Sequence, residues 1–113
     1  MQFTTLLNLA LLATSGFAYS NNCQGSSVDV KLSDCKAALA RIDKGKTYVD
    51  QAQFSVRNCY MIYATNGSGR HPIKGQYIWD TANSIINSCG KHKGSFGTNN
   101  NCDKCHVTVN YRA

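Results

Sequence analysis

The spacing of apolar residues predicts two helices and a small number of strands. The first helix is expected to start at Asp34, with Ser33 as its N-cap, because apolar side chains recur at helical spacing from there. Gly45, which lies between Lys44 and Lys46, is expected to end this segment. The apolar face of the predicted helix comprises Cys35, Ala38, Leu39 and Ile42.

Residues 53–64 change to an alternating pattern, in which every second side chain is apolar, and this indicates a β-strand. No turn signal occurs at Arg57 and Asn58, so we predict one long strand, bulged there if at all, rather than a hairpin. Residues 66–69 are predicted to form a loop, and Asn66 begins an N-glycosylation sequon in it.

The second helix is predicted from Pro72, a good first-turn residue, to Cys89, with Gly90 as its stop. Residues 94–101 are expected to be a polar loop, and residues 106–111 alternate as a final strand. The pattern is therefore α+β, with two helices on one face of a mostly antiparallel sheet. The helix presents an apolar face of Ile73, Ile78, Ala82, Ile85, Ile86 and Cys89.

An apolar leader without charged residues occupies the N-terminus, and we predict that residues 1–18 are a cleaved signal peptide. Cleavage after Ala18 fits best, and cleavage after Ser20 fits nearly as well. The rest, residues 19–113, is expected to be one secreted, extracellular domain. An even number of cysteines in such a domain indicates disulfides before a metal or haem site. The six are Cys23, Cys35, Cys59, Cys89, Cys102 and Cys105.

Residues 102–106 read C-x-x-C-H, a pattern with five interpretations. Haem attachment normally places the histidine on a helical turn, whereas here the motif runs into a strand. A zinc site would need two further ligands, and a thioredoxin-type pair would open a helix. A tight disulfide at a turn, or the ends of two different bridges, is therefore favoured. No metal or cofactor is expected.

The chain carries a net charge of +6, which favours anionic partners but equally keeps a secreted protein soluble. Enzymatic activity is not expected, because no two Asp residues stand out as a catalytic pair. The cations lack interleaved aromatics for base stacking, so nucleic acid is not an expected partner. One cluster contains Arg41, Lys44 and Lys46, and another contains Lys91, His92 and Lys93. The remaining histidines, His71 and His106, show no catalytic spacing.

Five segments resemble the fungal killer-protein-four toxins, small secreted cysteine-rich proteins. Residues 22–27, NCQGSS, resemble their N-C-R-G-S-S opening, and residues 59–64, CYMIYA, stand where the family has a C-x-F/Y strand. Residues 73–75 and 88–90 are similar to its I-x-x-L…H-G-C segment. Residues 107–111, VTVNY, resemble its terminal L-T-V-N-Y strand. Fungal necrosis-inducing-factor domains are the nearest competing resemblance.

This resemblance implies a two-layer α/β sandwich with antiparallel helices, stabilised by disulfides. By position it implies that Cys23 pairs with Cys89; a pairing of Cys35 with Cys59 would leave Cys102 with Cys105. It also implies a toxin or effector directed at fungi or a plant host and linked to interference with calcium entry. The family's functional basic residues precede its central strand, and Arg57 is the nearest equivalent here. This chain has fewer cysteines than better-known members and a shorter loop before the central strand.

Two functions are therefore expected as alternatives. The first is a monomeric toxin or effector that binds a membrane protein, such as a calcium channel, through cations. The second is a binding module for cell-wall glycan. The stacking faces for a glycan would come from Tyr60, Tyr63, Tyr77 or Trp79.

Overall fold

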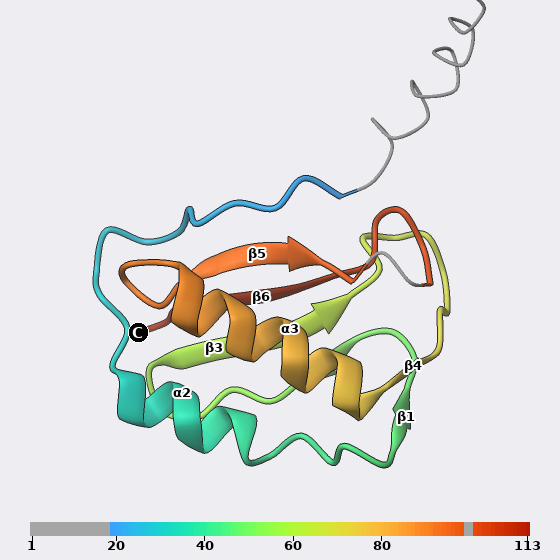
Figure 1. Cartoon of the computed structure of the whole chain (residues 1–113), viewed down its shortest axis with the longest axis horizontal. Coiled ribbons are helices and arrows are strands. Elements are labelled where there is room, and N and C mark those ends of the chain that lie inside the picture. The colour runs from blue at the N-terminus through green and yellow to red at the C-terminus, as the bar shows by residue number, and fades with distance from the viewer. Residues whose placement is uncertain (1–18, 99–100) are drawn as a thin grey trace, which may run out of the picture.

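The computed structural model describes residues 19–98 and 101–113 (Figure 1). The predicted signal peptide, residues 1–18, lies outside the described residues. Two helices are present in the described part of the chain, α2 (Leu32–Leu39) and α3 (Gly75–Ser88). Neither is long and apolar enough to cross a membrane.

The strands form one four-stranded sheet and one two-stranded sheet, and all their pairings are antiparallel. The larger sheet has the order β2-β3-β6-β5, with β3 and β6 at its centre. Its strands are β2 (Ala52–Gln53), β3 (Cys59–Ala64), β5 (Gly94–Gly97) and β6 (His106–Tyr111). The smaller sheet pairs β1 (Thr47–Tyr48) with β4 (Ile73–Lys74).

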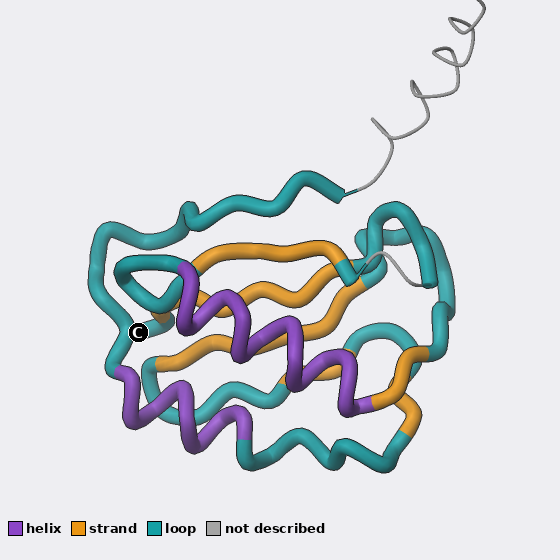
Figure 2. The backbone as a smooth tube through the Cα atoms, in the orientation of Figure 1, coloured by secondary structure: helices purple, strands orange, loops and turns teal. Residues whose placement is uncertain are grey.

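The two helices lie on the same face of the larger sheet (Figure 2) and, as the colour gradient of Figure 1 shows, run in opposite directions. The predicted α+β sandwich with two antiparallel helices on an antiparallel sheet is therefore confirmed. The loop that follows α2 bonds to the start of α3, because the Lys44 and Lys46 carbonyls accept hydrogen bonds from the backbone N–H groups of Gln76 and Gly75. The cations that follow α2 and those that follow α3 therefore lie near opposite ends of α3.

The core lies between the helices and the inner face of β3 and β6. Register pairs Met61 with Val109 and Tyr63 with Val107, and all four side chains are fully buried. Ile78, Ala82 and Ile85 of α3 meet this face, at the helical spacing the sequence shows. The alternation predicted for residues 106–111 follows from this register, because the intervening side chains of β6 lie on the outer face.

The first helix begins and ends earlier than the sequence predicts. Lys31 is the N-cap, so Ser33 lies within the first turn instead of capping it. The Lys31 carbonyl accepts hydrogen bonds from the backbone N–H groups of Asp34 and Cys35, at 3.1 and 3.2 Å. Beyond Leu39 the backbone hydrogen bonds change to the tighter i→i+3 pattern of turns. The predicted stop at Gly45 therefore lies in a loop and not at the end of the helix.

The single long strand predicted over residues 53–64 is wrong, because the chain reverses at Arg57 and Asn58. Val56 and Cys59 exchange backbone hydrogen bonds of 3.0 and 2.9 Å across this two-residue turn. Arg57 has a φ of +46°, in the left-handed region that a non-glycine residue rarely adopts. Long-range partners hold the turn: Arg57 binds Asp34, and the Asn58 side-chain amide donates to the Arg112 carbonyl at 2.9 Å.

Two further boundaries differ from prediction. Helix α3 starts at Gly75, because Ile73 and Lys74 are drawn into β4 by pairing with β1. Residues 94–97, predicted as part of a polar loop, are strand β5, which pairs with β6 on one side. On its other side, Ser95 exchanges backbone hydrogen bonds of 2.9 and 2.8 Å with Asn22. The N-terminal segment therefore runs along the outer edge of β5, as Figure 1 shows.

Candidate functional site

Three disulfides join all six cysteines, and no cysteine is free. Cys23–Cys89 ties the N-terminal segment to the end of α3, and Cys35–Cys59 ties α2 to β3. Cys102–Cys105 closes a turn just before β6. Cys23–Cys89 is the pair that the family resemblance implies, and Cys35–Cys59 with Cys102–Cys105 is the set predicted beside it.

The three bridges differ in how much chain they close. Their sequence separations are 66, 24 and 3 residues. In the chain-entropy picture, the Cys23–Cys89 loop stabilises the fold by about 4 kcal/mol and Cys35–Cys59 by about 3.5 kcal/mol. The loop of Cys102–Cys105 contributes only about 2 kcal/mol, so this bridge does the least for the fold.

The cations after α2 stand over aromatic rings. The ammonium nitrogen of Lys44 lies 4.0 Å from the centroid of the Trp79 ring, and that of Lys46 lies 5.1 Å from the centroid of Tyr48. Both are cation–π contacts, which at an exposed site favour this position of the cation by about 0.5–1 kcal/mol. Both lysines are exposed.

The cations after α3 differ from one another. Lys91 is exposed, and its ammonium group lies 3.7 Å from Asp29. Lys93, predicted as a target-binding cation, is instead only 4% exposed. Its ammonium group donates to the Val28 carbonyl at 2.9 Å and lies 3.9 Å from Asp29. It therefore anchors the N-terminal segment and cannot present its charge to a partner.

Arg57 is partly engaged within the molecule. Its Nε donates to Asp34 Oδ1 at 2.7 Å, while the guanidinium side chain remains largely exposed. The hydrogen bond from Arg57 lowers the pKa of Asp34, although burial of that carboxyl opposes the shift. Since Asp34 is nearly buried, this pair fixes the β2–β3 turn against α2.

The four aromatic side chains proposed as stacking faces are not equivalent. Tyr63 is fully buried, so its prediction as a glycan contact is wrong. Trp79 is half-buried, and Lys44 already covers one face of its ring. Tyr60 is half-buried on β3, whereas Tyr77 on α3 is 50% exposed and is the most open of the four.

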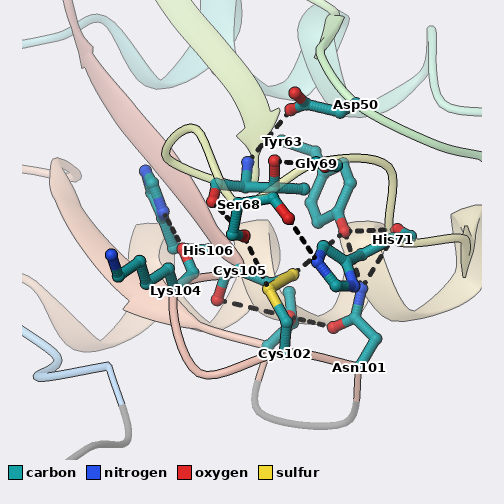
Figure 3. Close-up of a disulfide and its surroundings, with 12 residues drawn as sticks. Asp50, Tyr63, Ser68, Gly69, His71, Asn101, Cys102, Lys104, Cys105 and His106 are labelled. Atoms are coloured by element: carbon teal, nitrogen blue, oxygen red, sulfur yellow. Dashed lines mark hydrogen bonds between the residues drawn. A yellow bond between two sulfur atoms is a disulfide. The ribbon is translucent and has the colours of Figure 1, made fainter.

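Side chains from three separate segments meet at the Cys102–Cys105 disulfide, at one end of the sheet (Figure 3). Tyr63 Oη, at the end of β3, donates to the His71 carbonyl at 2.7 Å and contacts Cys105 Sγ at 3.4 Å. The Asn101 side-chain amide donates to Tyr63 Oη at 2.6 Å. On the other side, Ser68 Oγ lies 3.6 Å from Cys102 Sγ.

Burial raises the pKa of Tyr63, the nearby charge of Asp50 raises it further, and only the hydrogen bond from Asn101 acts in the opposite sense. The phenol therefore keeps its proton at neutral pH. Tyr63 Oη accepts a hydrogen bond from Asn101, and its single proton has two acceptors within reach: the His71 carbonyl at 2.7 Å, which is the closer, and Cys105 Sγ at 3.4 Å.

His71, Cys102 and Cys105 bring metal-binding atom types within 4.8 Å of one another. Both sulfurs are joined to each other, and a metal ion requires deprotonated thiolates. The oxidised cluster is thus a disulfide with a histidine beside it. His71 Nε2 lies 3.0 Å from the Ser68 carbonyl, so the tautomer with a proton on that nitrogen donates to it.

The other two histidines also bind backbone carbonyls. His92 Nδ1 lies 2.8 Å from the Ile86 carbonyl, and His106 Nδ1 lies 2.8 Å from the Lys104 carbonyl. The ring of His106 also stacks on Tyr19, with centroids 4.6 Å apart. Each of these two rings therefore has a role in holding the fold.

The sequon residue Asn66 is exposed in the loop after β3, with a φ of +56°. The hydroxyl residue of the sequon, Ser68, is the residue beside Cys102 Sγ. A glycan at Asn66 would therefore project from the loop that borders the disulfide cluster. Sequence reasoning missed Ser68 and Asn101 as neighbours of the sulfurs and gave Tyr63 a different role, because their approach to the sulfurs depends on strand ends and loops far apart in the chain.

The fold and its bridges define a small α+β protein stabilised by three disulfides. A family model matches residues 20–113, and the chain belongs to the meiotically up-regulated gene family. No curated protein and no solved structure matches the chain.

Proposed function

We propose that this protein is a secreted, killer-toxin-like protein or effector, antifungal or host-directed, that binds a membrane protein of a target cell and interferes with calcium entry. The resemblance of residues 22–27 and 107–111 to killer-protein-four toxins motivates this proposal. The disulfide-bonded α+β sandwich, with helices in the expected antiparallel arrangement, supports it.

The observation that carries the proposal is the exposed cationic pair Lys44 and Lys46. Neither forms a salt bridge within residues 19–98 and 101–113, so their charge is available to an acidic partner. Trp79 and Tyr48 hold the two ammonium groups in place. Such preorganisation reduces the side-chain entropy that binding would cost. The described residues contain no pocket, which favours recognition through an open surface.

Calcium imaging of fungal and plant cells exposed to the purified, oxidised protein tests this function. We expect calcium uptake to fall and growth to be inhibited, with relief by added calcium. The double variant Lys44→Gln/Lys46→Gln should lose the effect, whereas Lys44→Arg/Lys46→Arg, which keeps both charges and both ring contacts, should retain it. Unchanged calcium uptake in every fungal and plant cell type tested would contradict the proposal.

The alternative function is binding of a cell-wall glycan, and the exposure of Tyr77 favours it. An aromatic ring open on α3 offers a stacking surface that does not depend on charge. Pull-down with insoluble cell-wall polysaccharide separates the two functions. Retention that resists high salt and is lost in Tyr77→Ala would indicate glycan binding, whereas retention lost in salt would indicate only cationic adsorption.

A further inference from the structure

We propose that the Cys102–Cys105 pair is a thiol–disulfide exchange site, whose substrates are dithiols of small molecules or of other proteins. This inference is independent of the proposed action on calcium entry. It starts from a difference between the three bridges. Disulfide formation and folding stabilise each other by the same free energy. A bridge that adds little to the stability of the fold is therefore little protected by the fold against reduction. Cys102–Cys105, with a separation of 3 residues, gains the least.

The two sulfurs of this bridge have different surroundings. Cys105 is fully buried, whereas Cys102 is half-buried and lies in the turn at the end of the sheet. An incoming thiolate therefore reaches Cys102 Sγ, and Cys105 is the leaving group. The rate of exchange depends on access to the attacked sulfur and on how well the leaving thiolate is stabilised.

The structure supplies a hydrogen-bond donor to the leaving sulfur. Tyr63 Oη lies 3.4 Å from Cys105 Sγ and keeps its proton, which the His71 carbonyl accepts at 2.7 Å while the bridge is oxidised. The Asn101 amide donates both to the phenol oxygen and, at 3.2 Å, to the His71 carbonyl, so this carbonyl keeps a donor when the phenol proton turns to the sulfur. A hydrogen bond strengthens when its acceptor becomes charged, so the contact is worth more to the departing thiolate than to the disulfide. In this motif the phenol takes the place that a helix N-terminus occupies in other redox-active pairs.

The reaction balances with an external dithiol as the reductant. One thiolate of the dithiol attacks Cys102 Sγ, forming a mixed disulfide, and the Cys102–Cys105 bond breaks with its electron pair on Cys105 Sγ. The second thiol of the dithiol, after losing its proton to water, displaces Cys102 Sγ. The dithiol leaves as a disulfide, and the two cysteines, with two protons from solvent, are left as thiols. Reoxidation is the reverse reaction with an external disulfide.

The direct test exposes the oxidised full-length mature protein to dithiothreitol at graded ratios of its reduced and oxidised forms. Free thiols are then alkylated and located by peptide mapping. We expect Cys102 and Cys105 to be labelled at ratios that leave the other four cysteines protected and the far-ultraviolet circular dichroism unchanged. If Cys23 and Cys89 open at the same ratio or earlier, the proposal is wrong.

Two single-cysteine variants test which sulfur is attacked. Cys105→Ser leaves a thiol at the half-buried Cys102 position, and it should form a mixed disulfide rapidly with 5,5′-dithiobis(2-nitrobenzoate). Cys102→Ser leaves the buried Cys105 thiol, which should react roughly ten times more slowly or less, because thiolate access limits exchange. Equal rates in the two variants would overturn the assignment.

Tyr63→Phe tests the donor. Reduction of Cys102–Cys105 by dithiothreitol should slow roughly three- to tenfold, because a hydrogen bond to a charged group is lost. Asn101→Ala should slow it less, since the phenol remains. Tyr60→Phe, on the outer face of the same strand, is the matched control and should leave the rate unchanged. The melting curve of each variant shows whether the fold is kept, and an unaltered rate in folded Tyr63→Phe would refute the role of the phenol.

Discussion

Removing disulfides one at a time should destabilise the fold according to the length of chain that each one closes. The informative comparison is Cys102→Ala/Cys105→Ala against Cys23→Ala/Cys89→Ala. Each pair contains one buried cysteine, Cys105 in the first and Cys89 in the second. The packing lost in the two double variants is therefore similar, and the difference in their free energies of unfolding reports mainly on loop closure.

The expected magnitudes follow from the sequence separations. Closing the 3-residue separation of Cys102–Cys105 stabilises the protein by about 2 kcal/mol. The 66-residue separation of Cys23–Cys89 contains the whole Cys35–Cys59 loop, which shortens the effective loop to about 40 residues and still gives about 4 kcal/mol. The two double variants should therefore differ by about 2 kcal/mol, with the N-terminal pair costing more.

Equilibrium unfolding in guanidinium chloride under non-reducing conditions measures this difference, with Trp79 fluorescence and circular dichroism as two independent probes. Each variant needs its own denaturant slope, because an unfolded chain with fewer cross-links exposes more surface. A variant without Cys102 and Cys105 that loses as much stability as the one without Cys23 and Cys89 would refute the reasoning. That result would also remove the premise of the proposed exchange site.

Three further changes have defined outcomes. Gly94→Ala would place its Cβ 2.9 Å from Cys23 Cα, so we expect a loss of roughly 1–3 kcal/mol in chemical unfolding, whereas Gly90→Ala meets nothing within 4 Å and should be close to neutral. Because its arginine partner lowers the pKa of Asp34, this carboxylate stabilises the fold above its ordinary pKa of about 3.9, and that stability is lost as pH falls below it. Asp34→Asn should therefore flatten the acid limb of a stability–pH curve. Burial raises the pKa of Tyr63, so its contribution is complete below about pH 10 and is lost as pH rises above that; Tyr63→Phe should weaken this alkaline loss in unfolding measured from pH 8 to 11.

Local sequence signals predict the layers of this fold well and its turns poorly. The 3.6-residue spacing of Ile78, Ala82 and Ile85 places α3 against the sheet, and alternation places Val107 and Val109 in the core. Both patterns reflect burial along a single element, which the chain encodes locally.

The β2–β3 turn escapes such reasoning because its stabilising partners are remote. Arg57 adopts a φ that favours glycine, and it is held there by Asp34 from α2, while Asn58 binds the carbonyl of Arg112 beyond β6. Strand β5 escapes for a related reason. Three of its four residues are glycine or serine, yet β6 on one side and the N-terminal segment on the other satisfy backbone groups of this strand.

For the charged residues too, local sequence predicts position along the chain, whereas long-range contacts decide burial. Sequence reasoning places cations after both helices, and the helix dipole favours them there. It does not show which ones are exposed. Lys93 is buried because the Val28 carbonyl and Asp29 meet it from a segment that lies more than sixty residues earlier in the chain. Lys44 and Lys46 remain exposed: each ammonium group lies over an aromatic ring, and neither forms a salt bridge within the described residues.

Local signals likewise predict only a structural role for the C-x-x-C motif. A reactive pair needs a group that stabilises a thiolate, and the expected source is the N-terminus of a helix that follows the motif. Here a strand follows, so the local source is missing. The donor instead comes from Tyr63, whose strand β3 pairs with β6 so that Ala64 lies opposite His106, directly after the motif. Antiparallel pairing thus brings the phenol to Cys105, and the chemistry of the motif depends on its neighbouring strand.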